Sequence, residues 1–350
     1  MQHSELVRRL RLTLLDALKP ALGGPGPFVL IDYPDAANAG DHAIWIGEKI
    51  FLKTLGVEVA YQCSMETYDK IAMTKALGSG TILMHGGGNF GDTYIFHQFR
   101  HRILADFPDN KIVIFPQTVM FFTDAGIRQS AELFAAHTDV TIAVRDVLSF
   151  HILKKSFGPR QRIILAPDMA FMIQEQTRPI RPAFGIVWLS RMDSEGVHGA
   201  SIPETVKSQK LRQQNIHLGR HEDGIPTIVQ AQVAGSMLVV TDWYRCTLDQ
   251  QGLTRYKALG FDQRSSFWLR RALRILSFGH VVITDRLHAH ILCTLAGIPH
   301  VLLNNSYGKN VSFFETWCRP LDLCQLARSP AEAWALAQQF LISQKVPVQV

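Results

Sequence analysis

The most constraining feature of the sequence is a stretch near residue 290, where an apolar run, a helical pattern and a second apolar run follow closely. Residues 281–283 form an apolar run long enough for a buried strand. The helical pattern that follows continues to Ala296 and ends at Gly297. Residues 300–303 then predict another strand. A strand, a helix and a strand in this order form a β-α-β unit with parallel strands and a right-handed crossover.

Three reactive side chains follow the first of these strands. Asp285, Arg286 and His288 lie at its carboxyl end, where open α/β sheets bind ligands. A guanidinium forks onto carboxylate or phosphate, and an imidazole transfers protons near neutral pH. The helix N-terminus favours anions, and Thr284 or Asp285 is expected to cap it. The pattern indicates a site for an anionic substrate that undergoes proton transfer, or alternatively side chains that only cap and solvate a strand end.

A metal site is not predicted at this helix. His288 and His290 are two residues apart, and residues at that spacing do not face the same way on a helix.

Apolar runs alternate with helical patterns along most of the chain, which predicts doubly wound parallel sheets. The chain has 350 residues, more than one core usually organises. Segment 174–182, QEQTRPIRP, interrupts the alternation with two prolines and is predicted to be a linker. We therefore expect an N-terminal Rossmann-like domain over residues 1–175 and a C-terminal one over residues 183–350, with a last helix over residues 330–344.

Composition narrows the class of protein. The apolar share of 47% suits a globular chain, and no run of about 18 apolar residues predicts a membrane span. The first 20 residues carry charge throughout and predict an amphipathic helix ended by Pro20, not a signal peptide. Five scattered cysteines without a CxxC pair predict reduced thiols in a cytoplasmic protein.

The net charge of +6 favours acidic partners. Basic residues are mostly dispersed, so nucleic acid, which usually requires a basic stripe or a known module, is not predicted. The densest cluster lies on an amphipathic helical pattern and consists of Arg264, Arg270, Arg271 and Arg274. This face is expected either to be an ordinary solvated surface or to rest on phospholipid head groups at the inner face of the plasma membrane.

Polar loops also follow the strands of the first half. In the loop after the first strand, Asn38 is polar, Gly40 permits a tight turn and Asp41 can cap the next helix. Gln117 lies at the end of the fourth strand. Further polar loops lie at residues 85–92, 145–146 and 168. Together they predict a lined cleft that faces the second domain.

The glycine motif of residues 85–92, HGGGNFGD, contains GxGxxG. A dinucleotide site requires an acidic residue at the end of the next strand, which here ends in Phe-Pro-Gln, so NAD is not predicted. The glycines either let backbone N–H groups approach an anion or form a tight turn at a crowded sheet edge. The candidate binding residues of this motif are Gly86, Gly87, Gly88 and Asn89.

An ordered set of motifs gives the chain a resemblance to a known family. NAGDHAIW, HGGGNFGD, FPQT, VRD, APD, SRMDSE and ITDRLHAHILCTLAGIPHVLL follow one another between residues 28 and 317. Together they resemble the polysaccharide pyruvyl transferase family. The resemblance implies a fold similar to type B glycosyltransferases, with the active site in the cleft between two Rossmann-like halves. It also implies phosphoenolpyruvate as donor, and as acceptor a hexose of a bacterial exopolysaccharide or of its lipid-linked repeat unit. The product is a pyruvate ketal, commonly across O4 and O6.

The family motif carries over to Arg286, Leu287 and His288 as donor-site residues, with Arg191 as the match for an upstream arginine. Two arginines suit the carboxylate and phosphate of phosphoenolpyruvate. Ketal formation requires a proton on C3, for which His288 is the economical acid. Asp41 or Asp285 is the expected base, and the choice between them stays open. No metal or cofactor is required.

Two other functions stay open. A glycosyltransferase that uses a nucleotide sugar would also need the basic groups, and a non-catalytic protein of polysaccharide export would turn over neither donor. Residues 192–235 match no pattern, which leaves the acceptor sugar open.

Overall fold

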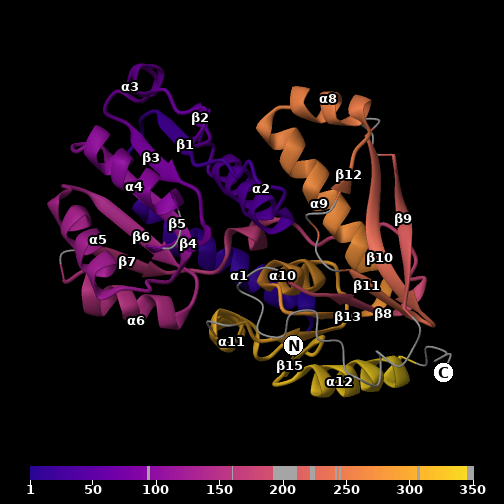
Figure 1. Cartoon of the computed structure of the whole chain (residues 1–350). Helices are drawn as coiled ribbons and strands as arrows, with labels where there is room; N and C mark the ends of the chain where they lie inside the picture. The colour runs from indigo at the N-terminus through magenta and orange to yellow at the C-terminus, as the bar shows by residue number, and fades with distance from the viewer. Residues whose placement is uncertain are drawn as a thin grey trace. The chain divides into compact units, whose positions relative to one another are not determined.

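The computed structural model describes residues 1–92, 95–159, 161–191, 211–220, 225–240, 243, 246–305 and 308–344. The chain divides into two compact units. Figure 1 shows the chain coloured by residue number from the N-terminus to the C-terminus. Unit 1 consists of Met1–Val7, Ala37–Ala43 and Gln174–Val350, and unit 2 of Arg8–Ala36 and Ile44–Ile173. Two short N-terminal segments therefore belong with the C-terminal half of the chain.

Unit 2 is built on a parallel sheet with strand order β2-β1-β3-β5-β6-β7, in which β4 pairs with β5. The strands are β1 (Phe28–Ile31), β2 (Val59–Cys63), β3 (Thr81–Met84), β4 (Gly87–Phe90), β5 (Lys111–Val119), β6 (Val140–Val144) and β7 (Arg162–Leu165). Alternate residues such as Ile112 and Ile114 point to one core, in which Phe134 and Leu153 from the covering helices are also buried.

The helices of this half of the chain follow the predicted alternation. They are α1 (His3–Leu18), η1 (Lys19–Ala21), α2 (Ala39–Thr54), α3 (Lys70–Leu77), α4 (Ile95–Asp106), α5 (Asp124–Ala136), α6 (Val147–Ser156) and η2 (Met169–Met172). Helices α1 and α2 begin in segments of unit 1 and continue in unit 2.

Unit 1 is built on a mostly parallel sheet of order β12-β10-β11-β8-β13-β14-β15, with β9 paired to β10. The strands are β8 (Phe184–Leu189), β9 (Arg212–Arg220), β10 (Pro226–Ala234), β11 (Met237–Val240), β12 (Cys246–Thr247), β13 (Gly279–Thr284), β14 (His300–Leu303) and β15 (Cys324–Ala327). All pairs from β11 to β15 are parallel, and β10 is antiparallel to its neighbours. The predicted α/β class, with two Rossmann-like units, is confirmed.

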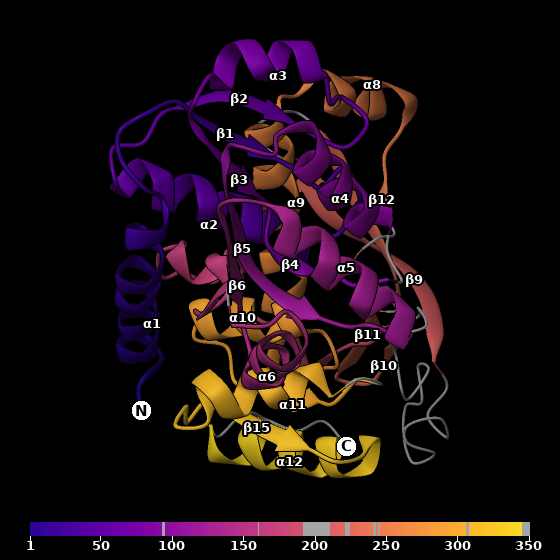
Figure 2. The same cartoon turned by 90° about the vertical axis from the view of Figure 1, so that its left-hand side faces the viewer.

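The helices of unit 1 are α8 (Gln250–Ala258), α9 (Phe261–Ser277), α10 (Leu287–Leu295), α11 (Lys309–Phe313), the π-helical turn η3 (Phe314–Cys318) and α12 (Pro330–Ser343). The predicted last helix is confirmed as α12, which packs along β13, β14 and β15. Figure 2 shows it beside β15. It starts sharply because the Ser329 hydroxyl accepts the Glu332 N–H and Pro330 occupies the first turn.

The glycine motif differs from the expected loop. Gly87–Phe90 forms the short strand β4, and β5 continues through Pro116 to Val119 to pair with it. Gly91 has φ 151°, and a Cβ on it would lie 1.5 Å from the Met120 carbonyl oxygen. The glycine therefore allows two backbone segments to approach closely, which is the structural alternative for this motif.

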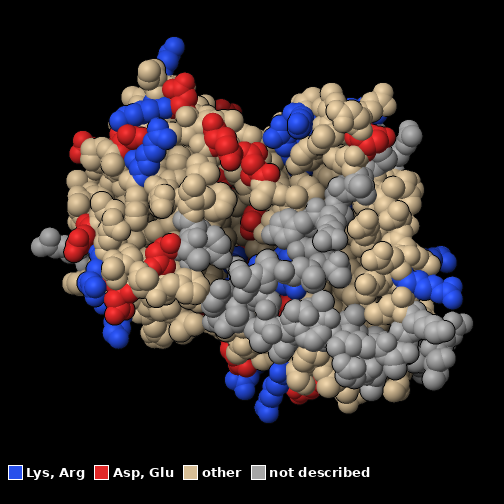
Figure 3. Space-filling view, in the orientation of Figure 1, with Lys and Arg blue, Asp and Glu red and all other residues tan. Residues whose placement is uncertain are grey.

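The arginine cluster also differs from expectation. Arg271 is fully buried on α9, and Arg264, Arg270 and Arg274 are half-buried, so they do not form the expected exposed surface. Figure 3 shows the described Lys and Arg side chains of one face interspersed with Asp and Glu. Within the described residues, no helix is long and apolar enough to cross a membrane.

The predicted linker is bound to unit 1 by backbone contacts. The Gln176 N–H donates to the Leu295 carbonyl over 2.9 Å. The Arg178 guanidinium donates to the carbonyls of Gly279 and His280, over 2.8 and 3.2 Å. The segment is thus held at the start of β13.

Candidate active site

The sheet of unit 1 changes direction between β8 and β13. The chain passes from β8 to β11 on one side, and β13 lies on the other. Such a switch point leaves a crevice at the carboxyl ends of the two strands, where ligands bind in open α/β sheets. Arg191 follows β8, and Asp285 and Arg286 follow β13. The sheet therefore brings these three predicted residues together. The rest of the predicted SRMDSE match, residues 192–195, lies outside the described residues.

Asp285 ties the two loops of the switch point together. Its Oδ1 accepts the Arg191 backbone N–H over 2.9 Å. Burial raises the pKa of the Asp285 carboxyl, which that N–H and the Arg286 guanidinium oppose. The expected cap is wrong, because Arg286 occupies the N-cap position of α10 and no side chain caps the helix there. The carboxylate accepts the Arg191 N–H instead, and the Thr284 hydroxyl accepts the Arg286 N–H over 3.1 Å.

Asp285→Asn is expected to keep turnover within about 3-fold, because Asn retains an oxygen that can accept the Arg191 N–H. Asp285→Ala should lose about 1–3 kcal/mol in the free energy of unfolding, the cost of an unsatisfied buried donor. Urea unfolding and steady-state turnover of both variants measure these effects. A loss of turnover above about 100-fold in a stable Asn variant would show that the charge itself takes part in catalysis.

Arg286 lies over an aromatic ring. Its Cζ is 5.7 Å from the ring centroid of Trp243, which is fully buried. Arg286 itself is 3% exposed, and the neighbouring Leu287 is also buried. A guanidinium stacked on an indole keeps its planar fork oriented for a carboxylate or phosphate.

The NAGDH loop, residues 38–42, leads into α2 and forms its first turn, which lies directly against His288. A Cβ built on Gly40 would be 2.1 Å from His288 Nδ1 and 2.7 Å from His288 Cβ. Only a residue without a side chain allows this approach. The fold therefore brings the NAGDH motif, predicted from a distant part of the sequence, to the imidazole of the DRLH motif within unit 1.

The two polar side chains of this loop hold each other. Asn38 Nδ2 donates to Asp41 Oδ2 over 2.8 Å, and the Gly40 N–H donates to Asn38 Oδ1 over 3.2 Å. Asp41 lies inside the first turn of α2, so the expectation that it caps this helix is wrong. The side chain of Asn38, which precedes the helix, accepts the Gly40 N–H instead. The Asp41 carboxylate is partly exposed, whereas Asp285 is buried.

The predicted glycine residues of unit 2 are engaged within the protein. The Gly86 N–H donates to Glu48 Oε1 over 2.8 Å, and His85 Nδ1 contacts Glu48 Oε2 at 2.9 Å. Gln117 Nε2 donates to the His85 carbonyl over 2.7 Å. Burial raises the pKa of the Glu48 carboxyl, and His85 opposes this. Glu48 was not predicted as a polar residue of this region. Its sequence signal is that it is the one carboxylate in the mostly apolar segment AIWIGEKI.

Asn89 and the later strand ends of unit 2 also make internal contacts. Arg100 donates to the side-chain and main-chain oxygens of Asn89, over 2.6 and 3.0 Å. Arg145 pairs with Asp168 at 2.6 Å, and Asp146 caps α6 through the Ser149 N–H. These polar groups fix strand ends, which favours the structural alternative for them. Gly87 and Gly88 lie in β4.

A buried group of His290, His300 and Cys324 is the one set of metal-ligand side chains found among the described residues. His300 Nδ1 donates to the Ile298 carbonyl over 2.8 Å, which leaves Nε2 of the neutral ring as an acceptor. His290 Nδ1 then donates to this nitrogen over 2.7 Å, and Cys324 Sγ lies 3.5 Å from His290 Nδ1. The chain of contacts joins α10 to β14 and β15, and His288 is not part of it.

The free energy of unfolding should fall as the pH is lowered, because His290 and His300 are buried as neutral rings. Burial lowers the pKa of His300 to about 4 and that of His290 well below its usual value. The unfolded chain binds these protons first, so stability is lost from about pH 6.5 down to pH 4, by up to about 1.4 kcal/mol per pH unit for each histidine. In urea unfolding across this window, His300→Gln should show a shallower pH slope, and the exposed His151→Gln should keep the wild-type slope. An unchanged slope in His300→Gln would contradict the assignment.

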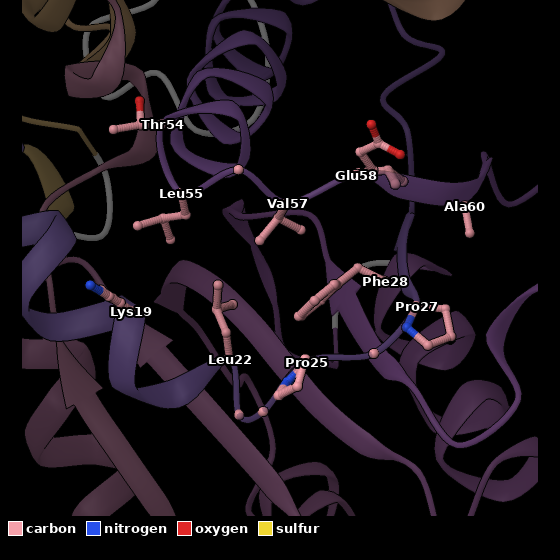
Figure 4. A pocket seen from close by; sticks show the side chains of 15 residues that line it. Lys19, Leu22, Pro25, Pro27, Phe28, Thr54, Leu55, Val57, Glu58 and Ala60 are labelled. Atoms are coloured by element: carbon pink, nitrogen blue, oxygen red, sulfur yellow. The ribbon is translucent and has the colours of Figure 1, made fainter.

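A cavity of about 910 Å³ lies elsewhere in unit 2 (Figure 4). Its lining includes Phe28 and Val59, the first residues of β1 and β2, so it is at the amino ends of these strands. Lys19 and Glu58 are its charged lining residues. Ligand sites of open α/β sheets lie at the opposite edge, so this cavity is separate from the residues above.

Two further residues of unit 1 were missed by sequence analysis. Asn310 Nδ2 donates to the carbonyls of Asp285 and Leu303, over 2.7 and 2.9 Å, and thereby joins the ends of β13 and β14. Lys309 is buried beside it, 9% exposed, and adds a cation after β14. The signal was the polar stretch NNSYGKN that follows the second strand of the β-α-β unit.

Comparisons with known proteins find a matching family model, relatives and a similar solved structure. A family model described as polysaccharide pyruvyl transferase matches residues 38–222 and 269–307. Pyruvyl transferase 1 of Schizosaccharomyces pombe is 33% identical over 304 residues, which cover 82% of this chain and 69% of that protein. EpsO of Bacillus subtilis, provisionally described as a pyruvyl transferase, is 27% identical over 323 residues, or 90% and 92% of the two chains. A crystal structure of an uncharacterized Klebsiella pneumoniae protein has a TM-score of 0.53 at 18% identity, covering 93% and 97%, and is similar in fold.

Proposed function

We propose, since the chain belongs to the polysaccharide pyruvyl transferase family, that it transfers the pyruvyl group of phosphoenolpyruvate to a hexose. The acceptor is a unit of a bacterial exopolysaccharide or of its lipid-linked precursor, and the product is a pyruvate ketal. The observation that carries the proposal is the approach of Gly40 to His288, which puts the NAGDH loop beside the DRLH motif.

Phosphoenolpyruvate fits the charges at the switch point of unit 1. The donor carries a carboxylate and a phosphate, and a guanidinium binds either group through two parallel hydrogen bonds. Arg286, with Leu287 beside it, takes one anionic group at the N-terminal end of α10, where the helix favours anions. Arg191 follows the adjacent strand and takes the other.

The chemistry follows from one acid and one base. His288 gives a proton to C3 of the enol, so the C=C bond is lost and C2 becomes cationic. A sugar hydroxyl adds to C2 and loses its proton, and the C2–O bond to phosphate breaks. A second hydroxyl then closes the ketal and loses its proton. We assign Asp41 as the proton acceptor, because its carboxylate is partly exposed while that of Asp285 is buried and accepts the Arg191 N–H.

We propose a cytoplasmic location, because phosphoenolpyruvate is made there. Contact with the inner membrane surface would come through a lipid-linked acceptor. The arginines of α9 are not assigned to lipid, because they are buried or half-buried.

The test is transfer from isotope-labelled phosphoenolpyruvate to the surface polysaccharide of the host cell. We expect label in the saccharide and release of one phosphate for each ketal. In D₂O the ketal methyl group should gain one deuterium, because C3 is protonated from solvent-exchanged His288. Transfer from a labelled nucleotide sugar instead would establish a glycosyltransferase, and binding of saccharide without turnover of either donor would establish an assembly protein.

A further inference from the structure

A buried arginine on α9 contacts the tryptophan that lies against the proposed donor-binding arginine. Arg271 is fully buried, and its guanidinium donates to the main-chain carbonyl of Trp243. The ring of Trp243 lies against Arg286, whose Cζ is 5.7 Å from the ring centroid. Arg271 therefore contacts the backbone of the residue on which the proposed donor-binding guanidinium rests.

The same guanidinium also contacts the ring of Trp268, which in turn packs on His42 in the first turn of α2. Arg271 Cζ lies 5.2 Å from the ring centroid of Trp268, and Trp268 stacks on His42 with centroids 6.0 Å apart and an interplanar angle of 8°. His42 Nδ1 contacts the Ser265 hydroxyl at 3.0 Å. α9 thus holds the end of the NAGDH motif through a ring stack and a hydrogen bond.

The contacts close into a ring of residues within unit 1. Arg286 and His288 are two residues apart at the start of α10, Gly40 lies against His288, and His42 is two residues after Gly40. From His42 the contacts return through Trp268, Arg271 and Trp243 to Arg286.

We propose that Arg271 is a positioning residue, which orients Arg286 through Trp243 and holds the NAGDH loop through Trp268. This inference rests on the proposed function. An arginine is required because one planar group donates at its edge and stacks with its face at the same time. A lysine keeps the charge but offers a single point donor and a weaker contact with the indole.

The test is a double-mutant cycle on the affinity for phosphoenolpyruvate, measured by titration calorimetry. Arg271→Lys should raise the Kd by about 10-fold, on the scale of one hydrogen bond to a charged group. In the Arg286→Lys background the same change should raise the Kd by less than about 2-fold, because Arg271 acts through Arg286. A general loss of structure would raise the Kd equally in both backgrounds. Arg274→Lys, on the same helix and half-buried, is the matched control and should stay within about 2-fold of wild type.

If Arg271→Lys is too unstable to measure, Arg271→Gln, which keeps an N–H donor for the Trp243 carbonyl, replaces it in the same cycle. Non-additive Kd values in either cycle support the inference. Additive values, with normal binding by the wild type, overturn it and leave the proposed function standing. A wild-type protein that does not bind phosphoenolpyruvate overturns both.

Discussion

His288→Gln is expected to bind phosphoenolpyruvate with nearly normal affinity and to lose turnover by about 10²–10⁴-fold, the usual contribution of general acid catalysis. Glutamine retains a polar N–H near the position of the imidazole but cannot release a proton to C3. Arg286, Arg191 and the helix N-terminus, which hold the donor in our proposal, are unchanged. The defect should therefore lie in kcat and not in the donor Kd.

Titration calorimetry for the Kd and single-turnover kinetics for the chemical step measure the two effects separately. Asn304→Ala is a suitable control, because Asn304 follows the neighbouring strand β14 and has no assigned role in proton transfer. Near-normal turnover in His288→Gln would remove the imidazole from proton transfer and leave it as a donor contact. A loss of affinity with unchanged turnover would lead to the same conclusion.

Gly40→Ala is expected to reduce turnover by at least about 100-fold, since misplacement of a catalytic group by about 1 Å has that effect. Alanine normally stabilises a helix by about 1 kcal/mol relative to glycine. Here the added methyl group would lie 2.1 Å from His288 Nδ1 and 2.7 Å from His288 Cβ. Rotation of the imidazole cannot relieve the second contact, so α10 or the loop must move. We expect a cost of about 1–3 kcal/mol in the free energy of unfolding, as for other overpacked sites.

A His288→Gly background tests the cause. There both the imidazole and the Cβ of residue 288 are gone, and Gly40→Ala should cost less stability than it does in the wild type. Gly24→Ala is the control for the methyl group itself, because a Cβ at Gly24 meets nothing within 4 Å. Equal destabilisation by Gly40→Ala in both backgrounds would mean that the loop does not act through His288.

The fold was predictable where strands are buried on both faces. Strand β14 has the predicted bounds, because a mostly apolar run such as HVLL is stable only inside a parallel sheet covered by helices. Strand β4 was not predictable from its pattern, since Gly87 and Gly88 have no side chains whose alternation could indicate a strand.

The site was predictable from the motifs that carry its chemistry but not from the contacts that hold it. Arg191, Asp285 and Arg286 come together because the carboxyl ends of β8 and β13 adjoin at the switch point. The helix cap expected of Asp285 was wrong, since local spacing favoured a cap and the tertiary partner, the Arg191 N–H, lies 94 residues away. Arg271 was expected at the surface because a helical pattern of residues does not predict which aromatic rings, here that of Trp268, pack against a charged side chain.

The division of the chain into segments has a consequence for its synthesis. Unit 2 has all of its residues once Ile173 has been translated, whereas unit 1 needs Met1–Val7 and Ala37–Ala43 together with a part that ends at Val350. At about 5–20 residues per second the first segments wait roughly 15–60 s for their partners. During that time the NAGDH loop has no His288 to rest against. A nascent chain should therefore carry a folded unit 2 well before both proposed catalytic groups are in place, and a nascent chain that lacks His288 should be inactive.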